Sequence, residues 1–310
     1  MRKGKTAILA SRRAVGARAF AGLHVTSFQE LAARGRTEWW RYLLAPLLGL
    51  VIATALGAAV FAVIEGAHLS PPDLRLDLQN PSQPAIFFAS MGIVSALIVA
   101  GLALAMRLVQ RKRARDVAGA WSGRFFVAGL ALWTAAQLLA LGLDYLVSPK
   151  SLHLTAGAAT LGLAAWALPA LALQSFMEEF LFRGYATQGF LLLARRPVAA
   201  AALSAILFGA MHIPNGAPQA ANALIFGFGC ALIAIRTASL SFTFGLHLAN
   251  NVFGAVVAVS QGDVFAGAPG ILRQDASGSI WLDVGVTAAA LAAVVWIAAR
   301  MTRIDGAAKP

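Results

Sequence analysis

The sequence predicts an all-α, polytopic membrane protein, because its composition, its apolar runs and its distribution of positive charge all point to this class. Of its 310 residues, 59% are hydrophobic and 12% are charged, and the mean hydropathy is +0.73. Soluble domains carry about 25% charged and about 45–50% apolar residues, so an ordinary soluble domain, a disordered chain and a fibrous repeat are excluded. Cys230 is the one cysteine, which leaves no disulfide partner within the chain and no cysteine-based zinc site.

Eight apolar runs are long enough, or nearly so, to cross a bilayer, which takes about 20 mainly apolar residues. The fifth and sixth runs are on the short side. Turn-forming residues such as Pro214-Asn215-Gly216 separate neighbouring runs. We therefore expect about eight transmembrane helices, at Tyr42–Val63, Ala85–Met106, Phe125–Leu146, Leu154–Met177, Val198–Ile213, Ala220–Ile235, Leu240–Val259 and Ile280–Ala299.

Positive charge alternates between the segments that these spans separate. Alternate segments hold 22 Lys and Arg residues on one side of the bilayer and 3 on the other, so the net charge of +12 reads as a topology signal rather than as a nucleic-acid surface. Because cytoplasmic segments are rich in Lys and Arg, we expect both termini in the cytoplasm. The expected organisation is a basic cytoplasmic arm (1–41), a transmembrane domain (42–300) and a cytoplasmic tail (301–310).

The first 26 residues are basic and contain no acid, a pattern shared by organellar transit peptides and by basic arms attracted to anionic lipid. We favour the arm. A cleavable signal peptide is not expected, because the first apolar run is long and starts late. No internal repeat is visible, so an inverted-repeat transporter has no direct support.

Two adjacent carboxylates and an arginine lie in an apolar stretch, where ionisable groups are costly and often functional. Glu179 and Arg183 are four residues apart, so we expect an ion pair. Glu178 points about 140° away from Arg183 around the helix, which leaves its charge less compensated. A carboxylate in apolar surroundings is a suitable proton acceptor from water. The alternative is a structural ion pair beside a spare Glu that reaches the headgroups.

Two histidines also lie in apolar runs. His212 shares a helix face with Phe208, and His247 shares one with Asn251, because the members of each pair are four residues apart. A single histidine in a membrane helix is more often hydrogen-bonded packing than a ligand. Two of them, together with an Asn and the Glu pair, favour a functional site.

The spacing also predicts a position for the first histidine. Glu178 lies 17 residues before Arg195, and His212 lies 17 residues after it. Arg195 itself lies in a stretch that resembles the turn between two helices. On antiparallel helices the two side chains would lie at nearly equal depth. They could then hold one water between them.

Three motifs, in order, resemble those of the type II CAAX prenyl endopeptidase family, whose bacterial branch is known as CPBP or Abi intramembrane proteases. Each motif is weak alone, but the ordered set in consecutive apolar helices is specific. The resemblance covers about Leu171–Phe253 and rests on Glu178-Glu179-x-x-x-Arg183, Phe208-x-x-x-His212 and His247-x-x-x-Asn251.

The resemblance implies an endopeptidase in which Glu178 and His212 activate a water for attack on a peptide carbonyl. It further implies that His247 and Asn251 stabilise the oxyanion or hold the site. The supporting residues would be Glu179, Arg183 and Phe208.

The residues allow either a zinc-dependent or a metal-free site, because Glu178, His212 and His247 could ligate zinc and leave a water position. We favour a metal-free mechanism, since Asn251 is a poor zinc ligand and suits an oxyanion donor better. The expected substrate is a membrane-embedded or lipidated peptide, and the expected location is the bacterial inner membrane. The alternatives are a proton- or ion-coupled transporter that uses the same acid and histidines, and a non-catalytic membrane scaffold.

Overall fold

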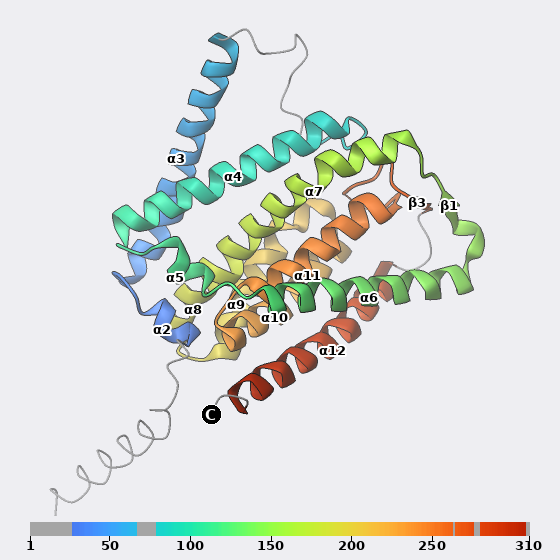
Figure 1. Cartoon of the computed structure of the whole chain (residues 1–310). Coiled ribbons are helices and arrows are strands. Elements are labelled where there is room, and N and C mark those ends of the chain that lie inside the picture. Colours follow the sequence, from blue (N-terminus) through green and yellow to red (C-terminus); the bar gives the residue numbers. More distant parts are fainter. Residues whose placement is uncertain (1–26, 67–78, 263, 276–279, 308–310) are drawn as a thin grey trace, which may run out of the picture.

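The computed structural model describes residues 27–66, 79–262, 264–275 and 280–307. Most of the basic arm therefore lies outside the described residues, as do His24, His68 and the last three residues of the tail. The described chain is almost entirely helical (Figure 1). Its α-helices are α2 Phe28–Ala32, α3 Trp39–Gly66, α4 Pro84–Val109, α5 Ala114–Ala118, α6 Gly123–Val147, α7 Ala158–Glu178, α8 Thr187–Ala194, α9 Pro197–Met211, α10 Ala217–Thr237, α11 Ser241–Val252 and α12 Ile280–Ala307.

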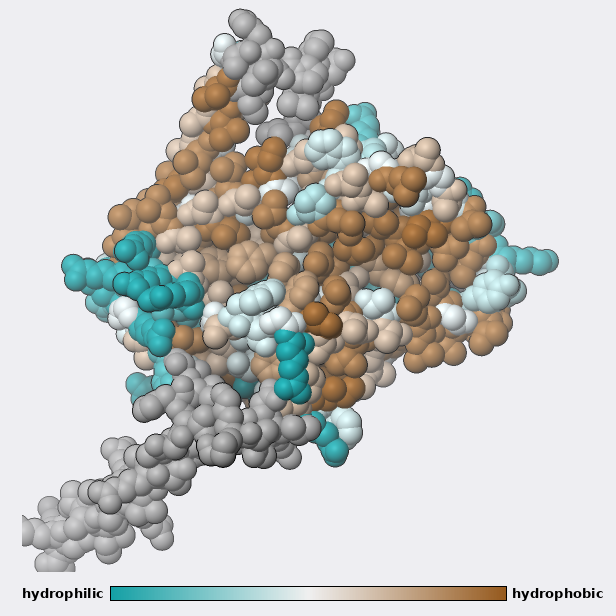
Figure 2. Space-filling view, in the orientation of Figure 1, coloured by the Kyte–Doolittle hydropathy of each residue, from teal (hydrophilic) through white to brown (hydrophobic). Residues whose placement is uncertain are grey.

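The helices are those of a multi-pass integral membrane protein. In the described part of the chain, six helices are long and apolar enough to span a bilayer. Their outer faces expose apolar side chains (Figure 2), and only 17% of the most apolar window of α3 is buried inside the protein. Such surfaces are stable in lipid and would aggregate in water.

Two of the eight expected spans are shorter than a bilayer-crossing helix. Helix α9 has 15 residues, which makes it about 22 Å long against a hydrocarbon core of about 30 Å. Helix α11 has 12 residues and continues into the five-residue π-helix η4, Phe253–Val257. The count of eight spans and the cytoplasmic placement of the termini therefore stay predictions.

The expected fourth span has different bounds in the structure. Helix α7, the π-helix η2 (Glu179–Ala186) and α8 form one apolar helix, Ala158–Ala194, of 37 residues. It starts later than the expected Leu154 because Leu152–Leu154 forms a strand. Glu178 consequently lies near the middle of a long helix rather than beyond the end of a span, and at about 1.5 Å per residue the helix must tilt or extend past the bilayer core.

A small sheet, which the sequence analysis did not anticipate, joins the loops at one end of the bundle. Strand β3 lies between the other two, antiparallel to β1 and parallel to β2. Three-residue strands are too short to give a recognisable alternation of apolar and polar residues. The strands are β1 Leu152–Leu154, β2 Ala258–Ser260 and β3 Leu272–Gln274, and the short 3₁₀ helices η1 Pro149–Ser151 and η3 Ile213–Asn215 complete the elements.

Helices α6 and α11 approach closely because each has a glycine at the crossing (Figure 1). A Cβ at Gly129 of α6 would overlap the carbonyl oxygen of Phe242, and a Cβ at Gly245 of α11 would overlap the carbonyl oxygen of Phe126. Small residues permit this backbone contact between membrane helices. Since α11 carries His247, the crossing helps to set the position of the candidate site.

We expect Gly245→Ala to destabilise the protein by about 1–3 kcal/mol, because the added methyl group must push α6 and α11 apart. Gly142→Ala is the matched control, since Gly142 also lies in α6 and a Cβ there meets nothing within 4 Å. Thermal unfolding in detergent micelles measures the difference. Equal melting midpoints for the two variants would contradict the close crossing.

Candidate active site

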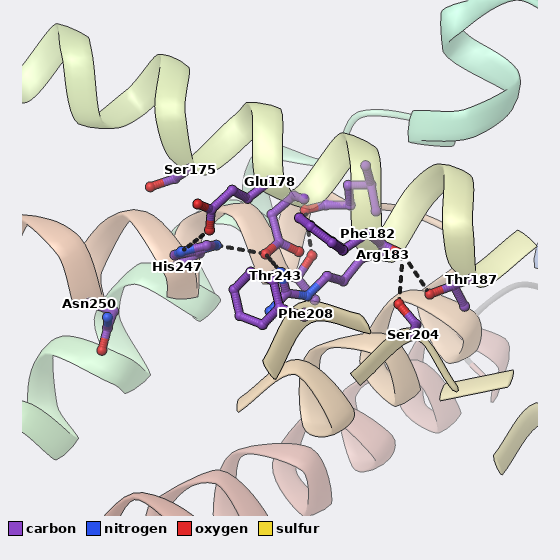
Figure 3. Close-up of polar contacts among 12 residues, drawn as sticks. Ser175, Glu178, Phe182, Arg183, Thr187, Ser204, Phe208, Thr243, His247 and Asn250 are labelled. Carbon is purple, nitrogen blue, oxygen red and sulfur yellow. Dashed lines mark hydrogen bonds and ion pairs between the residues drawn. The ribbon is translucent and has the colours of Figure 1, made fainter. Parts of the chain in front are cut away.

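The acidic pair lies where the long helix changes from α to π winding. Glu178 is the last residue of α7, and Glu179 is the first residue of η2. The carbonyl of Phe182 within η2 accepts hydrogen bonds from the hydroxyls of Thr187 (2.9 Å) and of Ser204 on α9 (2.8 Å) (Figure 3). The bond from Ser204 ties the widened turn to α9. Short π segments inside α-helices are frequent at functional sites.

Glu179 is the buried centre of the site. One of its oxygens, Oε1, lies 2.8 Å from Nδ1 of His247 and 3.3 Å from Nη1 of Arg183. The side chains of Glu179 and Arg183 are fully buried, and that of His247 is 5% exposed. The ion pair expected from the spacing therefore forms, and it also holds a histidine from α11 against the long helix.

Arg183 is stabilised by aromatic rings as well as by the carboxylate. Its guanidinium carbon lies 3.9 Å from the ring centroid of Phe208 and 5.7 Å from that of Phe226. A desolvated cation over an aromatic face gains about 2 kcal/mol or more. Phe208 of the second motif thus contacts Arg183 of the first.

Glu178 has a different environment from its neighbour, as its helical position predicts. Its Oε2 lies 3.4 Å from Nε2 of His247, and its Oε1 accepts a hydrogen bond from the side chain of Gln174. Its side chain is 15% exposed, whereas that of Glu179 is completely buried. Glu178 is therefore the acid of this pair that can meet a substrate or a water.

His247 lies between the two carboxylates, one at each ring nitrogen (Figure 3). The shorter contact assigns the Nδ1 proton to the bond with Glu179, an assignment made from the hydrogen-bond network. When the ring is doubly protonated, Nε2 donates to Glu178. When the ring is neutral and Glu178 holds the proton, Nε2 accepts from Glu178. The arrangement can thus exchange a proton between Glu178 and His247.

Asn251 contacts the helix that carries the acids. Its Nδ2 donates to Oε1 of Gln174 at 2.7 Å and lies 3.2 Å from Oγ of Ser175. Gln174 therefore receives a hydrogen bond from Asn251 and donates one to Glu178. The spacing shared by His247 and Asn251 brings both side chains onto α7, as expected from four residues on one helix face.

The sequence analysis missed three side chains that connect this network. Gln174 lies four residues before Glu178, so the same helical spacing could have found it. Trp133 and Asn250 could not be found this way, since the indole of Trp133 on α6 donates to Oδ1 of Asn250 at 3.0 Å across 117 residues. Asn250 in turn donates to Oδ1 of Asn251 at 3.1 Å.

His212 lies beside the network rather than within it. It caps the end of α9, where its Nδ1 lies 2.8 Å from the carbonyl oxygen of Phe208 and its ring centroid lies 4.5 Å from that of Phe208. Phe208 also packs edge-on against His247, at 6.2 Å between centroids. Among the described residues, no hydrogen bond or ion pair joins His212 to Glu178, so the shared water stays a prediction.

The side chains do not gather as a zinc site would require. Both ring nitrogens of His247 face carboxylates of the chain, and Nδ1 of His212 is directed at a backbone carbonyl. In the described ranges, no group of three His, Cys, Asp or Glu residues is arranged to hold a metal ion. A catalytic zinc site takes three such ligands.

We expect Arg183→Met to destabilise the protein by about 3–5 kcal/mol, because it leaves the buried Glu179 without its cation. The double variant Glu179→Met with Arg183→Met removes both charges, so it should recover much of that loss. Equilibrium unfolding in mixed micelles measures the wild type, the two single variants Glu179→Met and Arg183→Met, and the double variant. A double variant that loses the sum of the two single effects would show that the two side chains are not coupled.

Comparisons with known proteins agree with the motifs and the fold. Residues 160–253 match the family described as "Type II CAAX prenyl endopeptidase Rce1-like". The chain is also similar to the uncharacterized protein YyaK of Bacillus subtilis (strain 168), with 26% identity over 268 residues, covering 80% of this chain and 87% of that protein. No solved structure matches the chain significantly. The family match thus covers the stretch of the chain that holds all three motifs.

Proposed function

We propose that this protein is an intramembrane endopeptidase that hydrolyses a peptide bond of a membrane-associated substrate with a water activated by Glu178. One observation carries the proposal. Glu178 and Glu179, which lie in one long apolar helix, contact opposite ring nitrogens of His247. The match of this segment to an endopeptidase family supports the same reading. A structural role alone would need only the buried Glu179 and its partners.

Glu178 is the proposed general base. It is partly exposed, and the hydrogen bond from Gln174 orients its carboxylate. The carboxylate accepts a proton from water as the water oxygen bonds to the peptide carbonyl carbon. The proton later passes to the leaving nitrogen as the carbon–nitrogen bond breaks, so Glu178 ends the cycle ionised.

His247 is proposed to stabilise the negative charge that develops on the carbonyl oxygen. Glu179 accepts from Nδ1 and so orients the ring, which directs Nε2 toward Glu178 and the reacting atoms. A carboxylate that orients an imidazole also stabilises its protonated form. Arg183 is the cation that pairs with Glu179 in this arrangement.

Asn251 is the proposed second oxyanion donor, and His212 is the proposed partner of Glu178 on the water. The amide hydrogens of Asn251 are directed at Gln174 and Ser175, so donation to an oxyanion requires release of the longer contact, to Ser175 at 3.2 Å. The contact of His212 with the Phe208 carbonyl uses Nδ1, which leaves Nε2 out of that contact.

The substrate and the location belong to the same proposal. A site formed by side chains of membrane helices selects a peptide that is itself embedded in the bilayer or anchored by a lipid. Water-soluble peptides would be poor substrates. The bacterial inner membrane is the proposed location, and similarity to a Bacillus subtilis protein supports a bacterial setting.

We expect Glu178→Gln to lower cleavage by about 10²–10⁴-fold, the contribution typical of a general base. The assay uses the full chain in liposomes with lipidated and unmodified peptides and with solubilised membrane proteins, and mass spectrometry detects new peptide termini. Asp275→Asn is the matched control, because Asp275 also contacts a histidine, at 2.8 Å, but is 51% exposed and lies on the sheet end. His247→Ala should lose cleavage, and Asn251→Ala should lose less than Glu178→Gln.

The same liposomes separate the alternatives. Cleavage that survives Glu178→Gln would contradict the proposed base. Proton- or ion-coupled flux that depends on Glu178, without cleavage, would favour a transporter. Neither activity would favour a scaffold.

We expect cleavage to persist after exhaustive chelation, because the proposed mechanism uses only side chains of the chain. Elemental analysis of the purified protein should accompany the assay. Loss of cleavage on chelation, with recovery on addition of zinc alone, would require a metal in the reaction and would contradict this part of the proposal.

A further inference from the structure

A basic pocket lies at the end of α4, outside the candidate active site. It has a volume of about 240 Å³ and is lined by Arg107, Arg111 and Arg113. Arg107 lies in the last turn of α4, and the other two follow in the loop before α5. All three side chains are exposed. In Figure 2, hydrophilic residues gather at this end of the molecule, next to a broad apolar surface.

The carboxylates around this loop already have partners. Asp116 forms an ion pair with Arg34 at 2.8 Å and also accepts the backbone N–H of Arg113. Burial raises the pKa of Asp116, but the hydrogen bonds from Arg34 and from the Arg113 backbone, together with the charges of Arg34 and Lys112, hold that pKa below its usual value. Within the described ranges, no acidic side chain lies within ion-pair distance of the three pocket arginines.

Two carbonyl groups at the end of α4 are also capped. They would otherwise oppose an anion, since the carboxyl end of a helix carries partial negative charge. The guanidinium of Arg41 donates to the carbonyl oxygen of Val109, and the backbone N–H of Arg36 donates to that of Gln110 at 2.6 Å. The pocket therefore presents positive charge without local compensation.

A buried lysine fixes the shape of the loop. Lys112 is 1% exposed, and its Nζ donates to the carbonyl of Ala32 at 3.1 Å and to the hydroxyl of Tyr42 at 3.3 Å. Burial lowers the pKa of Lys112 to about 8. Residue 112 is thus anchored inward, while its exposed neighbours Arg111 and Arg113 both line the pocket.

The start of α3 places this pocket at the level of lipid headgroups. Trp39 and Trp40 are 70% and 43% exposed, and the guanidinium of Arg41 lies 4.3 Å from the centroid of the Trp40 ring. Exposed tryptophans at the end of a spanning helix mark the membrane interface. Because Arg41 also bonds to the end of α4, the arginine pocket lies at this interface.

We propose that Arg107, Arg111 and Arg113 form a binding site for the phosphate group of an anionic phospholipid in the adjacent leaflet. The guanidinium group suits this ligand, since its planar fork of donors matches phosphate oxygens in bidentate geometry. A free phosphate ion offers the same chemistry, but the neighbouring tryptophans and apolar surface favour a ligand that carries acyl chains.

The test variant is Arg111→Gly. Arg111 has a φ of 55°, a left-handed conformation that glycine adopts without strain, so the variant removes the guanidinium and should keep the fold. Arg195→Gly is the matched control, because Arg195 ends α8 with a φ of 53°, is exposed, and does not line the pocket. The double variant Arg107→Gln with Arg113→Gln tests the other two side chains with the loop backbone unchanged.

The full chain is reconstituted in vesicles of phosphatidylcholine with a minor fraction of phosphatidylglycerol, and native mass spectrometry measures the phospholipid retained. We expect Arg111→Gly to lower the preference for phosphatidylglycerol roughly fivefold, as for the loss of one interfacial arginine, and the double variant to lower it further. Arg195→Gly should keep the wild-type preference, and added inorganic phosphate should not displace the lipid.

Two results would overturn the proposal. Equal losses in Arg111→Gly and Arg195→Gly would show that only diffuse surface charge attracts the lipid. Displacement of the lipid by millimolar inorganic phosphate would assign the pocket to a free anion. Neither result depends on peptide cleavage, so the experiment tests lipid binding separately from the proposed peptidase activity.

Discussion

The contact of the buried Glu179 with Arg183 and His247 is the interaction on which the rest of the site depends. A lone carboxylate in apolar surroundings is too costly to keep ionised. One cation from its own helix and one histidine from α11 make this charge tolerable. The same contact joins the long helix to α11, and Phe208 on α9 covers the arginine. The buried Glu179–Arg183 pair and its neighbours thus link three helices.

Two backbone features shape the site around that contact. The π-helix η2 begins at the second of two adjacent glutamates, of which the first is partly exposed and the second is buried. The glycines at the crossing of α6 and α11 let Trp133 reach Asn250, which continues the hydrogen-bond network to Asn251 and Gln174. The polar network is therefore carried on rigid, closely packed helices, as a preorganised site requires.

The sequence predicted the class of fold because hydropathy reports directly on bilayer insertion, and it predicted the Glu179–Arg183 pair because that contact is local in one helix. It could not predict the length of the helix through Glu178, since an apolar run does not reveal where a π turn continues it. The small sheet was missed because its strands have three residues each. The Trp133–Asn250 bond was missed because it depends on how two distant helices cross.

The placement of His247 between two glutamates is central to the proposed chemistry. Nitrogen-15 chemical shifts of the His247 ring test this placement most directly. The measurement uses solid-state NMR on the reconstituted protein, with His247→Gln to assign the signals. We predict that Nδ1 of His247 carries a proton in a strong hydrogen bond, as its 2.8 Å contact with Glu179 requires. A His247 ring with a bare Nδ1 and its proton on Nε2 would contradict the account.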